Sequence, residues 1–138
     1  MTGFIQSKIK NTREIVLANK ASGTATTMNY LYDLVAGLAV AATSSSTRAT
    51  IGGVANQTIV SGDALTQVPL IAIHEGDVFL VDSTNNSDEA HNGQDMILGA
   101  NAYTVNNTGT TSAVGIVKQV GTFGVAADKK ILVRFLVV

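Results

Sequence analysis

Cysteine and tryptophan are absent from the sequence, proline occurs once, and only 14% of the residues are charged. Without cysteine the chain can form no disulfide, no thiolate metal site and no thiol nucleophile. The charged fraction is well below the usual level of about 25%, so Thr, Ser, Asn and Gly, or a partner chain, must cover part of the surface. No apolar run reaches the roughly 18 residues that a membrane-spanning helix needs.

The few charges are nearly balanced, with nine Lys and Arg against ten Asp and Glu. Nucleic-acid binding requires clustered basic residues, and attraction to an anionic membrane requires a polybasic segment, so we expect neither partner. Lys8, Lys10 and Arg13 are not followed by the apolar segment of a secretory signal. We therefore expect synthesis in a cytoplasm.

A hydrophobic content of 46% in 138 residues is enough to bury the core of one domain. Short apolar runs alternate with turns rich in Gly, Asn, Ser and Asp, which predicts an all-β fold. We predict an N-terminal arm at residues 1–13 and a single β domain at residues 14–138. The expected strands cover 14–18, 51–60, 65–73, 78–81, 96–105, 113–120, 121–125 and 130–138.

Residues 30–42 fit two interpretations. One is a helix whose apolar face holds Leu31, Leu34, Val35, Leu38 and Ala42. The other is a pair of strands that turn at Ala36-Gly37. Because a central glycine weakens a helix by about 1 kcal/mol relative to alanine, we favour the strands.

Glycine and proline mark three further features. Gly52-Gly53 within an apolar run predicts a β-bulge or a close backbone approach. Pro69 cannot donate to a sheet, which predicts an edge strand or a strand that begins after it. The turn residues His74 to Asp77 separate the apolar runs LIAI and VFLV, and this pattern predicts a β-hairpin.

The two ends of the chain carry apolar residues whose cover is not evident. At residues 1–13, apolar side chains stand among polar and basic ones, so the segment is either a frayed terminus or an arm that orders against a neighbour. The last segment, Lys130 to Val138, has apolar residues on both faces, which indicates a strand covered on both sides. Another subunit could supply the second cover.

A sequence echo links the two halves of the chain. The segment VAATSSSTRATIGGVANQ begins at Val40, and VNNTGTTSAVGIVKQ begins at Val105. Both run from valine through a Thr- and Ser-rich loop to glycine, an aliphatic pair, a polar residue and glutamine. Two copies of one strand–loop–strand unit would explain this match, and coincidence is the alternative.

No reaction centre is evident. His74 lies at the expected turn and His91 in a polar loop, and neither accompanies a nucleophile and a carboxylate in a recognisable arrangement. The acidic cluster fits neither an EF-hand nor a zinc pattern, so a solvated loop is expected and a weak cation site is the alternative. Its residues are Asp82, Asp88, Glu89, His91 and Asp95. We expect no metal, no cofactor and no catalysis.

Six segments together form a recognisable set: Gly53 to Ile59 (GVANQTI), Asp63 to Pro69 (DALTQVP), Glu75 to Phe79 (EGDVF), Thr84 to Asn86 (TNN), Gly115 to Val117 (GIV) and Ala126 to Val133 (AADKKILV). This set resembles small decoration (cement) proteins of tailed phages. The resemblance implies a compact β-barrel or β-tulip-like domain, and a sandwich is the other all-β architecture considered. It also implies a homotrimer on the capsid exterior that binds the major capsid protein and stabilises the shell.

The same resemblance implies an N-terminal arm that reaches neighbouring subunits. The candidate capsid or subunit contacts are therefore the apolar and basic residues of the two ends: Phe4, Ile5, Ile9, Arg13, Arg134 and Phe135. Two other functions remain open: a tail or head-fibre component of the virion, and a carbohydrate- or ligand-binding β module. The sequence has few aromatic residues for a sugar platform, and we expect Tyr30, Tyr32 and Tyr103 in a core or an interface.

Overall fold

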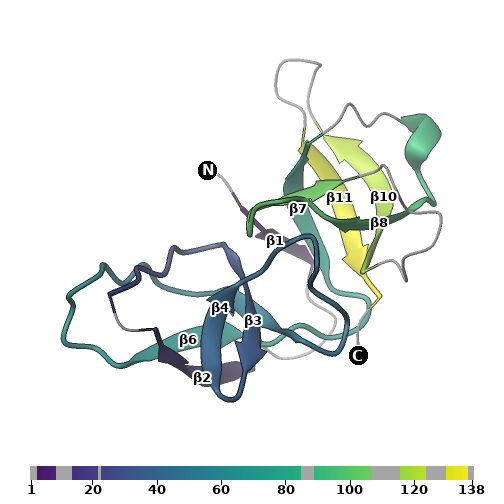
Figure 1. Cartoon of the computed structure of the whole chain (residues 1–138). Helices are drawn as coiled ribbons and strands as arrows, with labels where there is room; N and C mark the ends of the chain where they lie inside the picture. The colour runs from purple at the N-terminus through teal and green to yellow at the C-terminus, as the bar shows by residue number, and fades with distance from the viewer. Residues whose placement is uncertain are drawn as a thin grey trace.

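A computed structural model describes residues 3–8, 14–21, 23–84, 89–106, 116–123 and 130–136 (Figure 1). Regular structure in these ranges is strand apart from one 3-10 turn, η1 (Glu89–His91), so the all-β prediction is confirmed. The strands are β1 (Ile5–Lys8), β2 (Ile15–Lys20), β3 (Leu31–Val35), β4 (Leu38–Ala41), β5 (Ile51–Ala55), β6 (Gln67–Ile71), β7 (Val78–Ser83), β8 (Asp95–Leu98), β9 (Thr104–Asn106), β10 (Val117–Phe123) and β11 (Lys130–Phe135).

Strands β2 to β6 close into a five-stranded barrel, which we call barrel one. The ring runs β2-β4-β3-β5-β6 and back to β2, and each pair is antiparallel except β2–β4. Small residues suit the narrow interior of a five-stranded barrel. The buried interior holds Ala18, Tyr32, Ala39, Ala55, Val68 and Leu70, together with Ile59 from the loop between β5 and β6.

Tyr32 is the largest buried side chain of barrel one, and its hydroxyl oxygen accepts a hydrogen bond from the Thr27 N–H at 2.9 Å. Burial raises the pKa of this phenol and outweighs the Thr27 hydrogen bond, which lowers it. The folded protein therefore holds the proton more tightly than the unfolded chain, so this contribution to stability is present below about pH 10 and is lost as the pH rises further. In an ultraviolet titration of the protein, we expect a late phenolate transition that Tyr32→Phe removes. A late transition that persists in Tyr32→Phe would contradict this assignment.

Strands β7 to β11 form a second ring, which we call barrel two. The pairs β7–β11, β11–β10, β10–β8 and β8–β9 are antiparallel, and the parallel pair β9–β7 closes the ring. Strands β1 and β9 lie on the same side of β7. Strand β1 pairs antiparallel with the first half of β7, and β9 pairs parallel with the second half. The buried interior holds Phe79, Val81, Met96, Leu98, Val105, Val117, Ile131, Val133 and Phe135.

The two barrels have the same connectivity. Taken in chain order, the strands of each barrel pair in the same pattern, with the parallel pair between the first strand and the third. Superposing the pairing registers of the two barrels identifies equivalent buried residues, one in each barrel, that are 63 positions apart in the sequence. These pairs are Ala18 and Val81, Val68 and Ile131, and Leu70 and Val133. The chain is therefore an internal repeat of one barrel.

The sequence echo correctly indicated a repeated unit, but its alignment was wrong. It matched Gln57 with Gln119, whereas Ala55 lies opposite Leu70 and Gln119 lies opposite Val133. Ala55 is therefore the counterpart of Gln119. Runs of Gly, Val and Ala can be matched at several offsets, and only the pairing with a neighbouring strand fixes one of them.

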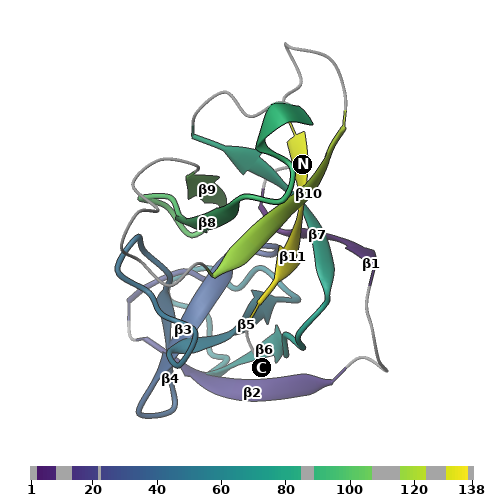
Figure 2. The same cartoon turned by 90° about the vertical axis from the view of Figure 1, so that its right-hand side faces the viewer.

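The barrels share a hydrophobic core. Leu31 and Val54 point out of barrel one and are buried in the cluster that fills barrel two. The Leu31 N–H also donates to the Ala102 carbonyl across this boundary at 2.8 Å. Figure 2 shows β3 and β5 between β2 and barrel two. The two barrels are thus joined through one core.

The predicted turn at Ala36-Gly37 is confirmed. Strands β3 and β4 pair directly across it, with Val35 opposite Leu38. Ala36 and Gly37 have φ values of 50° and 82°, respectively, both positive, as a two-residue type I′ hairpin requires. The helical alternative for residues 30–42 is therefore wrong.

Both consequences predicted for Gly52-Gly53 are present. The pairing of β3 with β5 shifts register between Tyr32 and Asp33, which places a bulge at Gly52. Gly53 lies so close to β6 that a Cβ atom built on it would collide with the Ile71 carbonyl oxygen. The glycine pair lets three strands of barrel one approach closely.

The prediction that Pro69 lies in an edge strand, or before its strand begins, is wrong. Pro69 is in the middle of β6, which pairs with β2 on one side and β5 on the other. The nitrogen and the carbonyl of Pro69 both face β5. The pairing of β5 with β6 ends at Ala55, which lies opposite Leu70, so no carbonyl of β5 requires a donor at Pro69. The Pro69 carbonyl accepts a hydrogen bond from the Asn56 N–H at 3.0 Å. The missing N–H therefore costs no ladder hydrogen bond.

The predicted hairpin at His74 to Asp77 is also wrong. The turn exists, because the Asp77 N–H donates to the His74 carbonyl at 3.0 Å and the Asp77 carboxylate accepts from the His74 N–H at 2.9 Å. The flanking strands do not pair with each other, since β6 belongs to barrel one and β7 to barrel two. Both sides of β6 are already occupied by β2 and β5, so this turn links the barrels.

Candidate binding surface

Two of the predicted contact residues lie inside the protein. Phe4 and Phe135 are 0% exposed, and with Phe79 they form an aromatic cluster whose ring centroids are 5.3 to 6.2 Å apart. Their assignment as capsid or subunit contacts is corrected, because core packing already uses both rings.

The other predicted contacts are placed differently. Ile5 is half-buried in β1, opposite Leu80, and Arg134 is exposed on β11, opposite Val78. Ile9 and Arg13 lie outside the described residues. The part of the predicted arm that the structure describes, residues 3–8, is integrated into barrel two through β1 and Phe4.

Exposed apolar residues concentrate on barrel one. Eight large apolar side chains are exposed in the described ranges, and Val120 on β10 is the one that belongs to barrel two. The seven on barrel one are Ile15, Leu17, Met28, Val35, Val40, Val60 and Leu65. Because apolar groups gathered on one region often mark an interaction surface, barrel one is the better candidate for contact with a partner.

Part of this exposure lies on two loops of barrel one, the loop between β2 and β3 and the loop between β5 and β6. We call Met28, Val60 and Leu65 the loop tip; the loop that leads into β6 forms the left end of Figure 1. The Met28 N–H donates to the Thr58 hydroxyl at 3.0 Å, and the Leu65 N–H donates to the Asp63 carboxylate at 2.9 Å. Buried Ile59 anchors the loop inside the barrel. The exposed apolar side chains of the loop tip therefore stand on loops that these contacts hold in place.

A second exposed group lies on β2. Val16 and Ala18 point toward the barrel interior, while Ile15 and Leu17 point outward and are 44% and 60% exposed. Their cross-strand neighbours on β6 are Ile71 and Pro69. The outer face of β2 is thus apolar without being covered by another described segment.

The Ser- and Thr-rich loop at residues 43–50 borders a hollow of about 460 Å³ whose floor includes Ile97 and Ile116 of barrel two. Asp33 orders this loop, because its carboxylate accepts hydrogen bonds from Ser46 at 2.5 Å and Thr50 at 3.2 Å. The hydroxyls on these residues therefore hold the loop in place.

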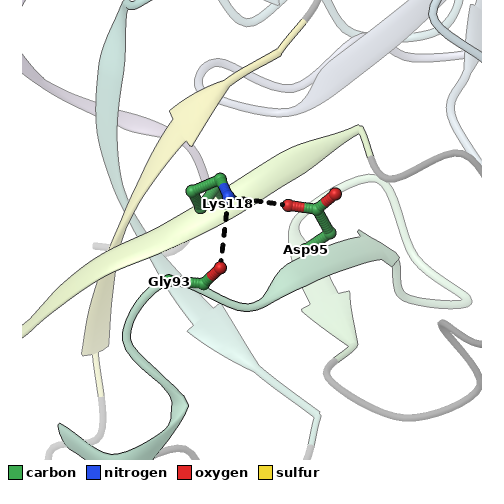
Figure 3. Close-up of polar contacts among 3 residues, drawn as sticks. All are labelled: Gly93, Asp95 and Lys118. Carbon is green, nitrogen blue, oxygen red and sulfur yellow. Dashed lines mark hydrogen bonds and ion pairs between the residues drawn. The ribbon is translucent and has the colours of Figure 1, made fainter.

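The acidic cluster is partly used by the fold. Lys118 pairs with Asp95 at 3.2 Å and donates to the Gly93 carbonyl at 3.2 Å (Figure 3). Lys130 pairs with Asp82 at 3.0 Å. These pairs link β10 to β8 and β11 to β7. They are partly exposed, and such pairs typically contribute about 0–1 kcal/mol each.

The remaining candidates for chemistry are dispersed. Within the described ranges, no group of three or more His, Asp or Glu residues is placed to hold a metal ion, and Asp88 lies outside these ranges. His91 ends η1, whereas His74 is in the linker between the barrels. Tyr30 and Tyr103 are half-buried and stack on each other, with ring centroids 4.7 Å apart. Tyr32 lies in the core of barrel one, as predicted, and Tyr30 packs against that core.

Sequence reasoning missed the exposed residues of barrel one. The run EIVLA identified a strand, but every position from Ile15 to Ala18 is apolar, so alternation could not show which face lies outside. Val60 is the last residue of the strand predicted over 51–60, and this position at the end of a strand was the one available signal of exposure.

No protein-family model matches the chain, and a search of curated proteins finds no match either. The ranges that the structure describes contain no candidate for a membrane-spanning helix.

Proposed function

We propose that this chain is a structural protein of a tailed phage that binds the outer surface of the capsid and stabilises the shell, without catalysis. Its partner in this proposal is the major capsid protein, and its location is the exterior of the virion. The family resemblance supplies the class of protein.

The uneven distribution of exposed apolar residues supports this proposal and relocates the contact. Seven of the eight exposed large apolar side chains in the described ranges belong to barrel one, while Phe4 and Phe135 are committed to the core. We therefore place the capsid contact at the loop tip. Each such contact is small, but many copies bound to one shell and linked to their neighbours gain avidity from effective concentration.

The test is binding to capsids that lack this protein, purified from the virus that encodes it. Val60 is 61% exposed, so Val60→Lys should preserve the fold while placing a charge in the apolar contact. We expect cosedimentation with capsids to weaken by at least about tenfold, which corresponds to about 1.4 kcal/mol.

Val120→Lys is the matched control, because Val120 is an exposed apolar residue on barrel two. It should bind capsids as the unaltered protein does. Equal binding by Val60→Lys, or equal weakening by Val120→Lys, would refute the placement of the contact. Failure of the unaltered protein to bind capsids would refute the proposed function.

A further inference from the structure

The internal repeat identifies an edge on barrel one that is occupied on barrel two. Strand β1 lies along the first half of β7, with Ile5 opposite Leu80. The registers make Val78 the counterpart of Ile15 and Leu80 the counterpart of Leu17. The corresponding side of β2 is paired with β4 only at Asn19 and Lys20. We call the segment Ile15–Leu17 the β2 edge.

The backbone directions show that this edge can accept a strand. The Glu14 carbonyl accepts a hydrogen bond from the Ala72 N–H, and the Lys20 N–H donates to the Thr66 carbonyl, so the backbone groups of Glu14 and Lys20 face β6. Backbone groups alternate along a strand, so those of Ile15 and Leu17 point away from β6. Asn19 follows the same rule and donates to the Gly37 carbonyl at 2.8 Å. No pairing among the described segments occupies this side of Ile15 and Leu17.

We propose that the β2 edge binds the β2 edge of a second copy of this chain, forming a continuous antiparallel sheet across a twofold axis at Val16. In this register Ile15 of each copy lies opposite Leu17 of the other, and each such pair exchanges two backbone hydrogen bonds. The outward Ile15 and Leu17 side chains would then pack against each other across the axis.

Self-pairing fits this edge better than pairing with β1 of another copy, because Phe4 anchors β1 in its own barrel two. Residues 15–17 contain no charge, no proline and no register shift in their pairing with β6, the features that commonly prevent edges from associating. The twofold arrangement produces a dimer, whereas the family resemblance implies a trimer, so stoichiometry separates the two.

Sedimentation velocity over a range of concentrations tests the dimer. The contact is short, so we expect a dissociation constant of about 10–500 µM. Leu17→Lys places a charge opposite Ile15 of the second copy, so it should raise this constant by at least about tenfold. Leu17 is 60% exposed, so its replacement leaves the core intact. Val60→Lys, at a residue that is 61% exposed, is the matched control and should leave the dimer unchanged.

Amide hydrogen exchange provides a backbone readout that does not depend on a variant. Raising the concentration of the unaltered protein through the dissociation constant should slow exchange at the Ile15 and Leu17 amides. The Val16 amide faces β6 and should respond much less. A chain that stays monomeric at about 1 mM, forms a trimer, or dimerises equally well with Leu17→Lys would overturn the proposal.

This inference does not rest on the proposed function. Leu17→Lys should weaken the dimer and retain capsid binding by the individual chain, whereas Val60→Lys should do the reverse. If the unaltered chain binds capsids but stays monomeric, the dimer fails and the proposed function stands. If it dimerises but does not bind capsids, the proposed function fails and the dimer stands.

Discussion

Replacing Phe4 with alanine is expected to lower the free energy of unfolding by about 3–5 kcal/mol, the usual cost of truncating a buried phenylalanine. The Phe4 ring is 0% exposed and packs against Phe79 and Phe135, with centroid distances of 6.2 and 5.8 Å. Truncation would leave a cavity among rigid aromatic rings, which cannot collapse to fill it. Urea denaturation followed by circular dichroism measures the loss.

Val60→Ala is the control for Phe4→Ala, because an exposed side chain contributes little to stability and the change should stay within about 0.5 kcal/mol. Deleting residues 1–8 removes both Phe4 and the β1–β7 pairing, so it should destabilise the protein at least as much as Phe4→Ala. Unchanged denaturation midpoints for both variants would show that the aromatic cluster does not include Phe4.

Gly53→Ala should be the other strongly destabilising substitution, with a cost of about 2–4 kcal/mol. The added Cβ would collide with the Ile71 carbonyl oxygen, and the Leu70 Cβ would be only 3.1 Å away. Both obstacles belong to β6, whose backbone is fixed by pairing on two sides, so relief requires β5 and β6 to move apart. Thermal or urea unfolding gives the size of the effect.

Gly121→Ala tests whether this cost comes from the close approach. Gly121 also lies at a register shift, in the pairing of β10 with β11, but its nearest neighbour is the end of the flexible Leu132 side chain, 3.4 Å from an added Cβ. We expect a change of no more than about 1 kcal/mol. Comparable losses in the two variants would mean that the bulges, not the contact with Ile71, set the cost.

Much of the candidate surface could not be predicted, because exposure is a property of the assembled barrels. Phe4 and Leu17 are both apolar residues near the N-terminus, yet Phe4 is 0% exposed and Leu17 is 60% exposed. The difference arises because barrel two provides an aromatic pocket for Phe4, while no described segment covers the outer face of β2. Neither fact is encoded in the residues next to them.

The sequence by itself determined the all-β class, the Ala36-Gly37 turn and the glycine bulge, since backbone conformation at these sites depends on residues within a few positions. The strand bounds were partly wrong: the strand predicted over 96–105 is divided into β8 and β9, the two strands predicted over 113–120 and 121–125 are replaced by the single strand β10, and β5 ends at Ala55. Only the tertiary structure decided which strands pair. It separated β6 from β7 across a turn that looks like a hairpin, placed Pro69 between two strands, and fixed the alignment of the repeated barrels. The physical reason is that pairing requires a vacant strand edge and a matching register, and both depend on segments far away in the chain.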